Sequence, residues 1–188
     1  MGAEIQRKQQ LINATIQAIG ETGSLDVTVG KIAKIAGVSS ALAFHYFGDK
    51  EALFLAAMRD ILQRYSRDVS AALAVADTPE QRLDALIRAN FGTSHFDRGV
   101  IAAWMNFYVL AQRSDAARRL LRIYHARLLS NLAHALRPLT GDQARSIALR
   151  LSAQIDGIYL RAALNPTGAS PEEAAAQVLA TLKRELAF

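Results

Sequence analysis

The sequence comprises 188 residues, of which 51% are hydrophobic and 21% charged, with a formal net charge of +5 and no cysteine. This length fits one large domain or a small domain fused to a larger one. The lack of cysteine excludes disulfides and thiolate metal sites, and no run approaches the roughly 18 apolar residues of a membrane span. Because the N-terminus is polar, unlike a secretion signal, we expect a cytoplasmic protein that makes no membrane contact.

Apolar residues recur at helical spacing along the whole chain, and no segment keeps the period of two that is typical of strands. We therefore predict an all-α fold of about nine helices. The expected helices are 5–22, 28–36, 39–46, a long helix that opens after 48–49, 79–91, 97–112, 115–136, 142–164 and 171–186. The expected breaks are Gly92, Ser114, 138–141 and 165–170. Gly23 is expected as a left-handed cap, Thr28 as an N-cap and Pro79 as a first helical residue.

The segment Thr28–Phe47 has the spacing of a helix-turn-helix. This motif needs a small residue where its helices cross, a turn residue that tolerates positive φ and an apolar residue directly after it. Ala33, Gly37 and Val38 occupy these places. The residues then expected to face the first helix are Ile32, Ala36, Ala43 and Phe47. A generic helical hairpin with the same alanine–glycine packing is the alternative.

The third predicted helix and its N-terminus would leave an exposed face of short polar and aromatic side chains. Such a helix fits a DNA major groove, where these groups can contact phosphates and base edges. The residues expected on this face are Ser39, Ser40, Ala41, Leu42, Phe44, His45 and Tyr46. His45 has no Ser, Asp or Glu at a spacing that supports catalysis, and the four histidines show no metal-binding spacing. We therefore expect no enzyme activity, no catalytic or metal site and no cofactor.

The strongest resemblance to a known family lies in residues 20–54, which read GETGSLDVTVGKIAKIAGVSSALAFHYFGDKEALF. They resemble the signature of the TetR family of transcriptional repressors almost end to end. The resemblance implies a DNA-binding domain over 1–50 and a helical ligand-sensing and dimerisation domain over 51–188. It also implies that Thr28 and Lys50 lie at helix N-termini against the phosphates of a near-palindromic operator. A protein–protein adaptor whose helix-turn-helix no longer binds DNA is the alternative.

Three later stretches narrow the resemblance within this family. Residues 102–111, 124–138 and 154–164 read AAWMNFYVLA, YHARLLSNLAHALRP and QIDGIYLRAAL. They resemble repressors of glycine-betaine synthesis genes that respond to choline. The resemblance implies choline or a related quaternary ammonium compound as the effector. A TetR-type regulator that responds to a different small hydrophobic or cationic compound is the alternative.

A quaternary ammonium group donates no hydrogen bond, so aromatic faces, with or without a carboxylate, must hold it. Trp104 and Tyr108 lie four residues apart on one predicted helix, and Asp156 and Tyr159 lie three apart on another. Each pair therefore shares a helix face. The residues expected to bind the ligand are Asn90, Phe91, Trp104, Met105, Tyr108, Asp156 and Tyr159. The alternative is that the aromatic residues are core and that Asp156 pairs with an arginine such as Arg127 or Arg161.

The last two predicted helices have apolar stripes that suit a homodimer. Two such helices from each subunit can form a four-helix interface, as the family resemblance implies. The stripes consist of Ile147, Leu151, Ile155 and Ile158 on one helix and Val178, Leu179, Leu182 and Leu186 on the other. Intramolecular packing of the same residues is the alternative. The family also implies that the ligand favours a conformer in which the fourth helix swings and spoils the half-site spacing.

Overall fold

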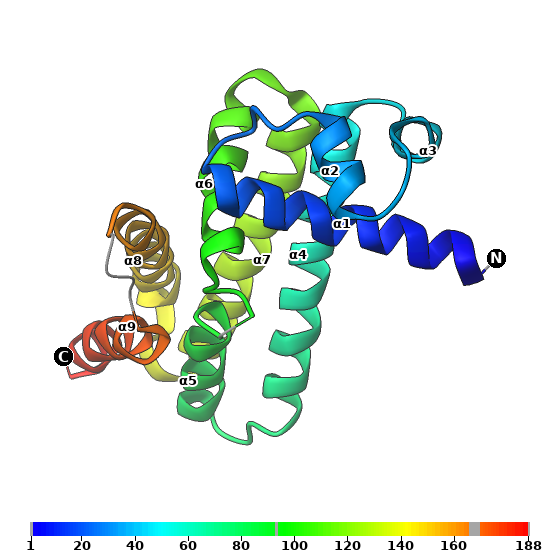
Figure 1. The fold of residues 1–188 in the computed structure, drawn as a ribbon. Coiled ribbons are helices and arrows are strands. Elements are labelled where there is room, and N and C mark those ends of the chain that lie inside the picture. The colour runs from blue at the N-terminus through cyan, green and yellow to red at the C-terminus, as the bar shows by residue number, and fades with distance from the viewer. Residues whose placement is uncertain (1, 93, 166–169, 188) are drawn as a thin grey trace. The chain divides into compact units, whose positions relative to one another are not determined.

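A computed structural model describes residues 2–92, 94–165 and 170–187 of the chain. In this part of the chain the regular structure is helical and no residue lies in a strand, so the all-α prediction is confirmed (Figure 1). The elements are α1 (Gly2–Thr22), α2 (Val29–Ile35), α3 (Ser40–Phe47), α4 (Lys50–Ala74), α5 (Pro79–Asn90), α6 (Arg98–Arg113), α7 (Asp115–Thr140), a 3₁₀ turn (Gly141–Gln143), α8 (Ala144–Leu164) and α9 (Pro171–Leu186). Among the described residues, no helix has the length and apolar character that a bilayer span requires.

The chain divides into two compact units. The described residues up to Leu62, together with Asp97–Arg118, form the first unit, which contains α1, α2, α3 and α6. Gln63–Phe96 and the described residues from Arg119 onward form the second unit, which contains α5, α8 and α9. Each of the helices α4 and α7 contributes residues to both units.

Side-chain chemistry sets several helix ends. The Thr28 hydroxyl oxygen accepts a hydrogen bond of 3.2 Å from a backbone N–H in the first turn of α2, and Ser39 does the same for α3 at 3.2 Å. Thr78 begins a capping box ahead of α5, with Pro79 as the first helical residue. Gly23 follows α1 with a φ of +66°. The predicted roles of Gly23, Thr28 and Pro79 are therefore confirmed.

The break predicted over 138–141 was placed too early. Helix α7 runs through Pro138 to Thr140, and Gly141, with a φ of +54°, follows it. Proline removes the N–H group that would bond to the His134 carbonyl, and the helix continues for only two residues beyond it. The Thr140 hydroxyl donates a hydrogen bond of 3.0 Å to the Leu136 carbonyl at this end of the helix.

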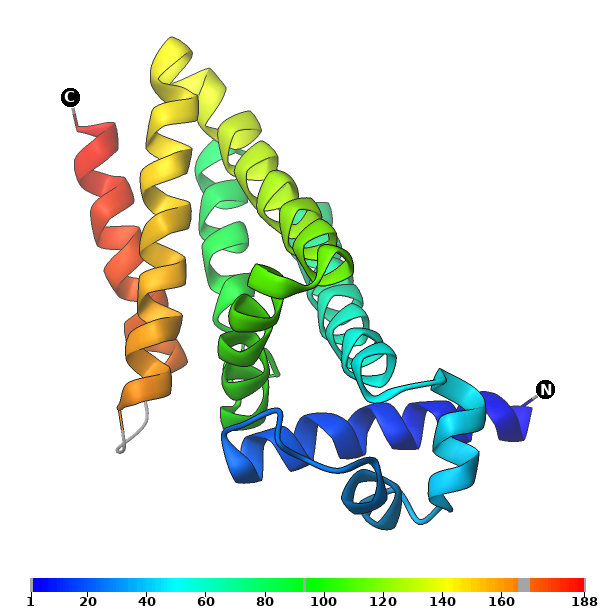
Figure 2. The same cartoon turned by 90° about the horizontal axis from the view of Figure 1, so that it is seen from above.

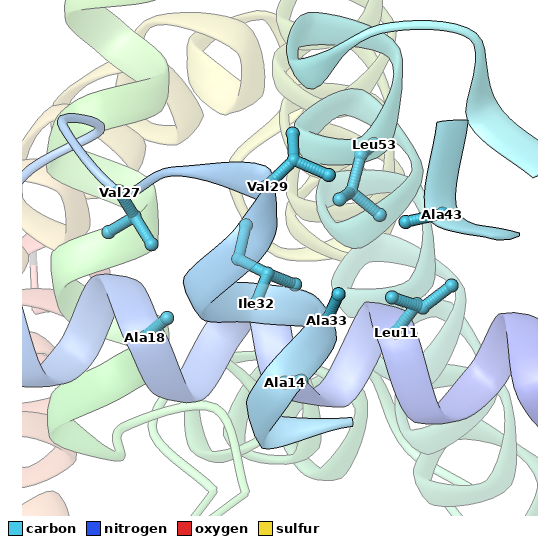
Figure 3. Close-up of a cluster of buried hydrophobic side chains, with 9 residues drawn as sticks. All are labelled: Leu11, Ala14, Ala18, Val27, Val29, Ile32, Ala33, Ala43 and Leu53. Atoms are coloured by element: carbon cyan, nitrogen blue, oxygen red, sulfur yellow. The ribbon is translucent and has the colours of Figure 1, made fainter. Parts of the chain in front are cut away.

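Small side chains let the first helices of the first unit pack closely (Figure 3). Their buried cluster consists of Leu11, Ala14, Ala18, Val27, Val29, Ile32, Ala33, Ala43 and Leu53. Because many of these residues are alanines, the helix backbones can approach one another. Leu11 of α1 lies beside Ala33 of α2 and Ala43 of α3 and is 0% exposed (Figure 3). Leu11 therefore contributes a large side chain to the contact between α1 and the helices α2 and α3.

Two glycines face each other where α1 and α6 meet in the first unit. A Cβ atom added to Gly20 would lie 2.6 Å from the Gly99 Cα atom, closer than real side chains approach. Near the end of α1, the Asn106 Nδ2 atom donates a hydrogen bond of 3.1 Å to the Gly23 carbonyl. These two contacts fix α6 against α1.

Helices α8 and α9 lie side by side in the second unit (Figures 1 and 2). The predicted stripe residues that are buried within the chain are Ile147, Leu151, Ile155, Ile158, Val178 and Leu182. Leu179 and Leu186 are half-buried. Arg150 Nη2 also lies 2.6 Å from Glu185 Oε2 and joins the two helices. The alternative of intramolecular packing therefore holds for the buried stripe residues.

Candidate nucleic-acid interface and effector site

The segment that joins α2 to α3 has the turn geometry that its spacing predicts. Gly37 adopts a φ of +68°, in the left-handed region that favours glycine. The Val38 backbone N–H donates to the Ala33 carbonyl at 3.0 Å and closes the turn. Ala33 is 1% exposed and lies in the buried cluster. The predicted places of Ala33, Gly37 and Val38 are confirmed.

Helix α3 turns one face to the core and the other to solvent. The exposed residues are Ser39, Ser40, Ala41, Phe44 and His45, whereas Leu42 is half-buried. Phe44 is 49% exposed, which is high for a large apolar side chain and leaves its ring available for contact. Of the residues predicted to face the first helix, the buried ones are Ile32 and Ala43 and the half-buried ones are Ala36 and Phe47.

Tyr46 departs from the prediction of an exposed side chain. Its ring is half-buried and packs against the cluster under α3. The Lys8 Nζ atom of α1 lies 5.2 Å from the centre of this ring, a distance that suits a cation–π contact. Lys8 also hydrogen bonds to Glu4 at 2.7 Å and holds the pKa of that carboxyl below its ordinary value. The half-buried ring of Tyr46 therefore helps to hold α3 against the buried cluster.

Thr28 and Lys50 are exposed residues at the beginnings of α2 and α4. The Thr28 oxygen accepts the capping hydrogen bond, so its hydroxyl hydrogen is still available to donate. Asp49 caps α4 by accepting a hydrogen bond of 2.7 Å from the Ala52 backbone N–H, and Lys50 follows it directly. A hydroxyl group and an ammonium group are both donors that suit phosphate oxygens.

Aromatic side chains pack together in the second unit. Tyr159 of α8 stacks on Phe91, with ring centres 5.8 Å apart, and Phe96 meets Tyr159 edge-on at 5.3 Å. The Tyr159 hydroxyl donates to the Asn90 carbonyl and also lies 3.3 Å from the His95 carbonyl. Burial raises the pKa of Tyr159 well above its ordinary value. The structure thus brings together three predicted ligand residues, Asn90, Phe91 and Tyr159.

Two polar side chains predicted to bind the ligand, those of Asn90 and Asp156, make defined contacts in this unit. Asn90 is 1% exposed, and its Nδ2 atom donates to the Leu86 carbonyl at 2.7 Å. Asp156 is half-buried, and its Oδ2 atom lies 3.6 Å from His125 Nε2. The Asp156 carboxylate therefore lies near the imidazole ring of His125.

A second group of rings in this unit was not predicted. Tyr65 of α4 meets His95 and Tyr124 edge-on, with ring centres 5.8 Å and 5.7 Å apart. His95 is 4% exposed, and its Nε2 atom lies 2.6 Å from Asp68 Oδ2. The available sequence signal was the spacing of Tyr65 and Asp68, three residues apart on one helix face.

The remaining predicted ligand residues, Trp104, Met105 and Tyr108, belong to α6 in the first unit. The rings of Trp104 and Tyr108 lie 5.9 Å apart, so the predicted shared face is confirmed. Phe107 meets Trp104 edge-on at 5.9 Å, and its ring centre lies 6.5 Å from that of Phe54 in a tilted arrangement. Trp104 is 6% exposed, whereas Met105 and Tyr108 are half-buried.

Both halves of the chain match known protein families. Residues 11–57 match the tetR family of bacterial regulatory proteins, and residues 79–187 match the C-terminal family of BetI-type transcriptional repressors. The HTH-type transcriptional regulator BetI of Brucella melitensis biotype 1 is 50% identical over 95% of this chain and 89% of its own length. The regulator of the same name from Rhizobium meliloti is 45% identical over 94% of this chain and 87% of its own length.

Solved structures agree with this assignment. A transcriptional regulator from Pseudomonas aeruginosa PAO1 has a TM-score of 0.81 and 28% identity, over 97% of this chain and 91% of that one. A regulator from Saccharomonospora viridis in complex with choline has a TM-score of 0.84 at 20% identity, over 94% and 95% of the two chains, and shows a shared fold. The chain therefore belongs to the TetR family of bacterial transcriptional regulators, as a DNA-binding repressor with a BetI-type C-terminal region.

Proposed function

We propose that this repressor releases its operator when it binds choline or a related quaternary ammonium compound, and so controls genes of glycine-betaine synthesis in the bacterial cytoplasm. The observation that carries the proposal is the 50% identity to regulators named BetI over 95% of the chain. The aromatic side chains of Phe91, Trp104, Tyr108 and Tyr159 add chemical support, because ring faces attract a cation that cannot donate hydrogen bonds.

Residues 1–50 act in this proposal as the DNA-binding domain, and residues 51–188 sense the ligand and dimerise. The reading surface comprises Thr28, Ser39, Ser40, Ala41, Leu42, Phe44, His45, Tyr46 and Lys50. Thr28 and Lys50 bind phosphates and set the register on the duplex, while the exposed side chains of α3 reach the base edges of the major groove. The exposure of Phe44 and His45 supports the assignment of base contacts to α3.

Lys50→Ala is expected to weaken binding to every duplex and to reduce the slope of log affinity against log salt by about 1, because one phosphate contact is lost. His45→Ala is expected to cost about 1–3 kcal/mol on the operator. Fluorescence anisotropy over a range of salt concentrations measures both effects. Lys183→Ala, which removes an exposed charge from α9, is the matched control. An equal loss of affinity in both lysine variants would contradict the role of Lys50.

The proposed effector site comprises Asn90, Phe91, Trp104, Met105, Tyr108, Asp156 and Tyr159. Calorimetry with choline is expected to give binding heat with the wild-type protein at millimolar ligand. Trp104→Ala and Asp156→Asn are expected to weaken binding by about 0.5–2 kcal/mol each, since one removes a ring face and the other a negative charge. Asp142→Asn, on the exposed 3₁₀ turn, controls for charge. No heat with the wild-type protein would remove choline as the effector and leave the repressor assignment intact.

The proposed homodimer uses the outer faces of the last two helices. Leu149, Leu160 and Leu164 of α8 are 50%, 51% and 76% exposed, and Ala153 and Gly157 between them are exposed as well. The spacing of these five residues places them on one side of α8. Such a stripe of small and apolar side chains suits a second copy of the same helix. A two-fold symmetric dimer would then require a near-palindromic operator.

The proposed mechanism is a shift between two conformers. Helix α4 supports it, because one continuous helix begins at Lys50 in the reading surface and extends to Ala74 in the second unit. A ligand that prefers the conformer with the wrong half-site spacing lowers operator affinity. A nearly complete shift needs about 5.5 kcal/mol of differential affinity for the two states.

A further inference from the structure

Tyr65 occupies an unusual position in the second unit. Its ring lies edge-on to His95, from the connection between α5 and α6, at an interplanar angle of 85°, and to Tyr124 of α7 at 68°. Three rings from three separate elements therefore meet at this point. Aromatic rings gathered in this way are a common feature of sites that bind quaternary ammonium groups.

The Tyr65 hydroxyl oxygen is buried and has no hydrogen-bond partner among the described residues. A buried hydroxyl in this state destabilises a protein, so it calls for a physical reason. Burial raises the pKa of Tyr65 well above its ordinary value, so the group remains a protonated donor. The Asn90 side chain lies near enough to lower this pKa slightly, but it does not meet the geometry of a hydrogen bond to the Tyr65 oxygen. Tyr159 differs, because its hydroxyl donates to the Asn90 carbonyl.

The Asp68 carboxylate beside these rings favours a ligand that carries no negative charge. The Asp68 carboxylate lies 2.6 Å from the Nε2 atom of His95, whose ring faces Tyr65. A carboxylate at this position disfavours an anionic ligand group and leaves neutral or positive groups. Because the protonated Tyr65 hydroxyl donates, and an ammonium group cannot accept a hydrogen bond, the ligand group that suits it is a neutral acceptor such as an alcohol.

We propose that the Tyr65 hydroxyl hydrogen bonds to the alcohol group of a quaternary ammonium alcohol, and that Tyr65 thereby distinguishes choline from cations of similar size that lack the hydroxyl. This inference rests on the proposed function and adds a specificity-determining residue to the effector site. Tyr124 and His95 orient the Tyr65 ring, and the Asp68 carboxylate orients His95.

The test compares choline with ethyltrimethylammonium, which differs only in lacking the hydroxyl group. The wild-type protein is expected to bind choline about 3- to 10-fold more tightly, the contribution of one net hydrogen bond. Tyr65→Phe is expected to remove this preference by weakening choline alone. Ser70→Ala removes an exposed hydroxyl group from the same helix, α4, and is expected to keep the preference.

Each outcome of this calorimetric comparison has one meaning. A wild-type protein without preference between the two cations, or a Tyr65→Phe variant that retains the preference, overturns the inference while the proposed function stands. A wild-type protein that binds neither cation overturns both. Operator binding by unliganded Tyr65→Phe is expected to equal that of the wild type, which verifies that the variant folds.

Discussion

Leu11→Ala is expected to lower the free energy of unfolding by about 2–5 kcal/mol and to abolish operator binding at concentrations where the wild type is saturated. Leu11 is fully buried, and Ala33 and Ala43 lie beside it (Figure 3). Alanine side chains cannot swing into the space that the substitution leaves, so the cavity closes only if whole helices move. Such a movement displaces α3 from its position on α1.

Urea unfolding followed by circular dichroism measures the loss of stability, and anisotropy with the operator measures the loss of function. Ile5→Ala is the matched control, because Ile5 lies on the same helix and is 64% exposed. This variant is expected to behave like the wild type to within about 0.5 kcal/mol. Similar urea midpoints for the two variants would show that the cluster around Leu11 does not hold α3.

Gly20→Ala is expected to destabilise the protein by about 1–3 kcal/mol, although alanine is the better helix former. The added Cβ would lie 2.6 Å from the Gly99 Cα atom. A backbone atom cannot rotate away as a flexible side chain can, so α1 and α6 must separate. Because α6 also bonds to the end of α1 through Asn106, the separation strains both contacts.

Gly30→Ala makes the same chemical change and is expected to have the opposite effect on stability. Its Cβ atom would meet the Ser40 side chain at 3.6 Å, an ordinary contact, inside α2. This variant is expected to be more stable by up to about 1 kcal/mol. Urea unfolding of the two variants under identical conditions compares them. A gain of stability in Gly20→Ala would mean that the two helices adjust at little cost.

The helix-turn-helix could be predicted from sequence because its determinants are local. Thr28 and Ser39 cap helices within three residues of themselves, and Gly37 supplies the left-handed turn. Such short-range interactions leave a fixed pattern in the sequence. Tyr46 was harder to place, because its burial depends on Lys8 and α1 rather than on neighbours along α3.

The residues of the proposed effector site were harder to predict because several of them meet through long-range contacts. Tyr65, His95 and Tyr124 come from three elements far apart in the chain, and no periodic pattern links them. The two faces of α8 illustrate the same difficulty. Ile155 and Leu160 are both apolar, but Ile155 packs inside its own chain and Leu160 is exposed. Periodicity shows that a stripe exists but not what covers it.

Choline-sensitive operator binding is tested most directly with the wild-type protein and a labelled near-palindromic duplex from the control region of the glycine-betaine synthesis genes. Two chains are expected to bind each duplex, with an affinity that falls steeply between about 50 and about 200 mM salt and is lost in millimolar choline. Affinity that does not change with salt would contradict binding through the phosphate contacts of the reading surface. Affinity that persists unchanged in choline would contradict release by this effector.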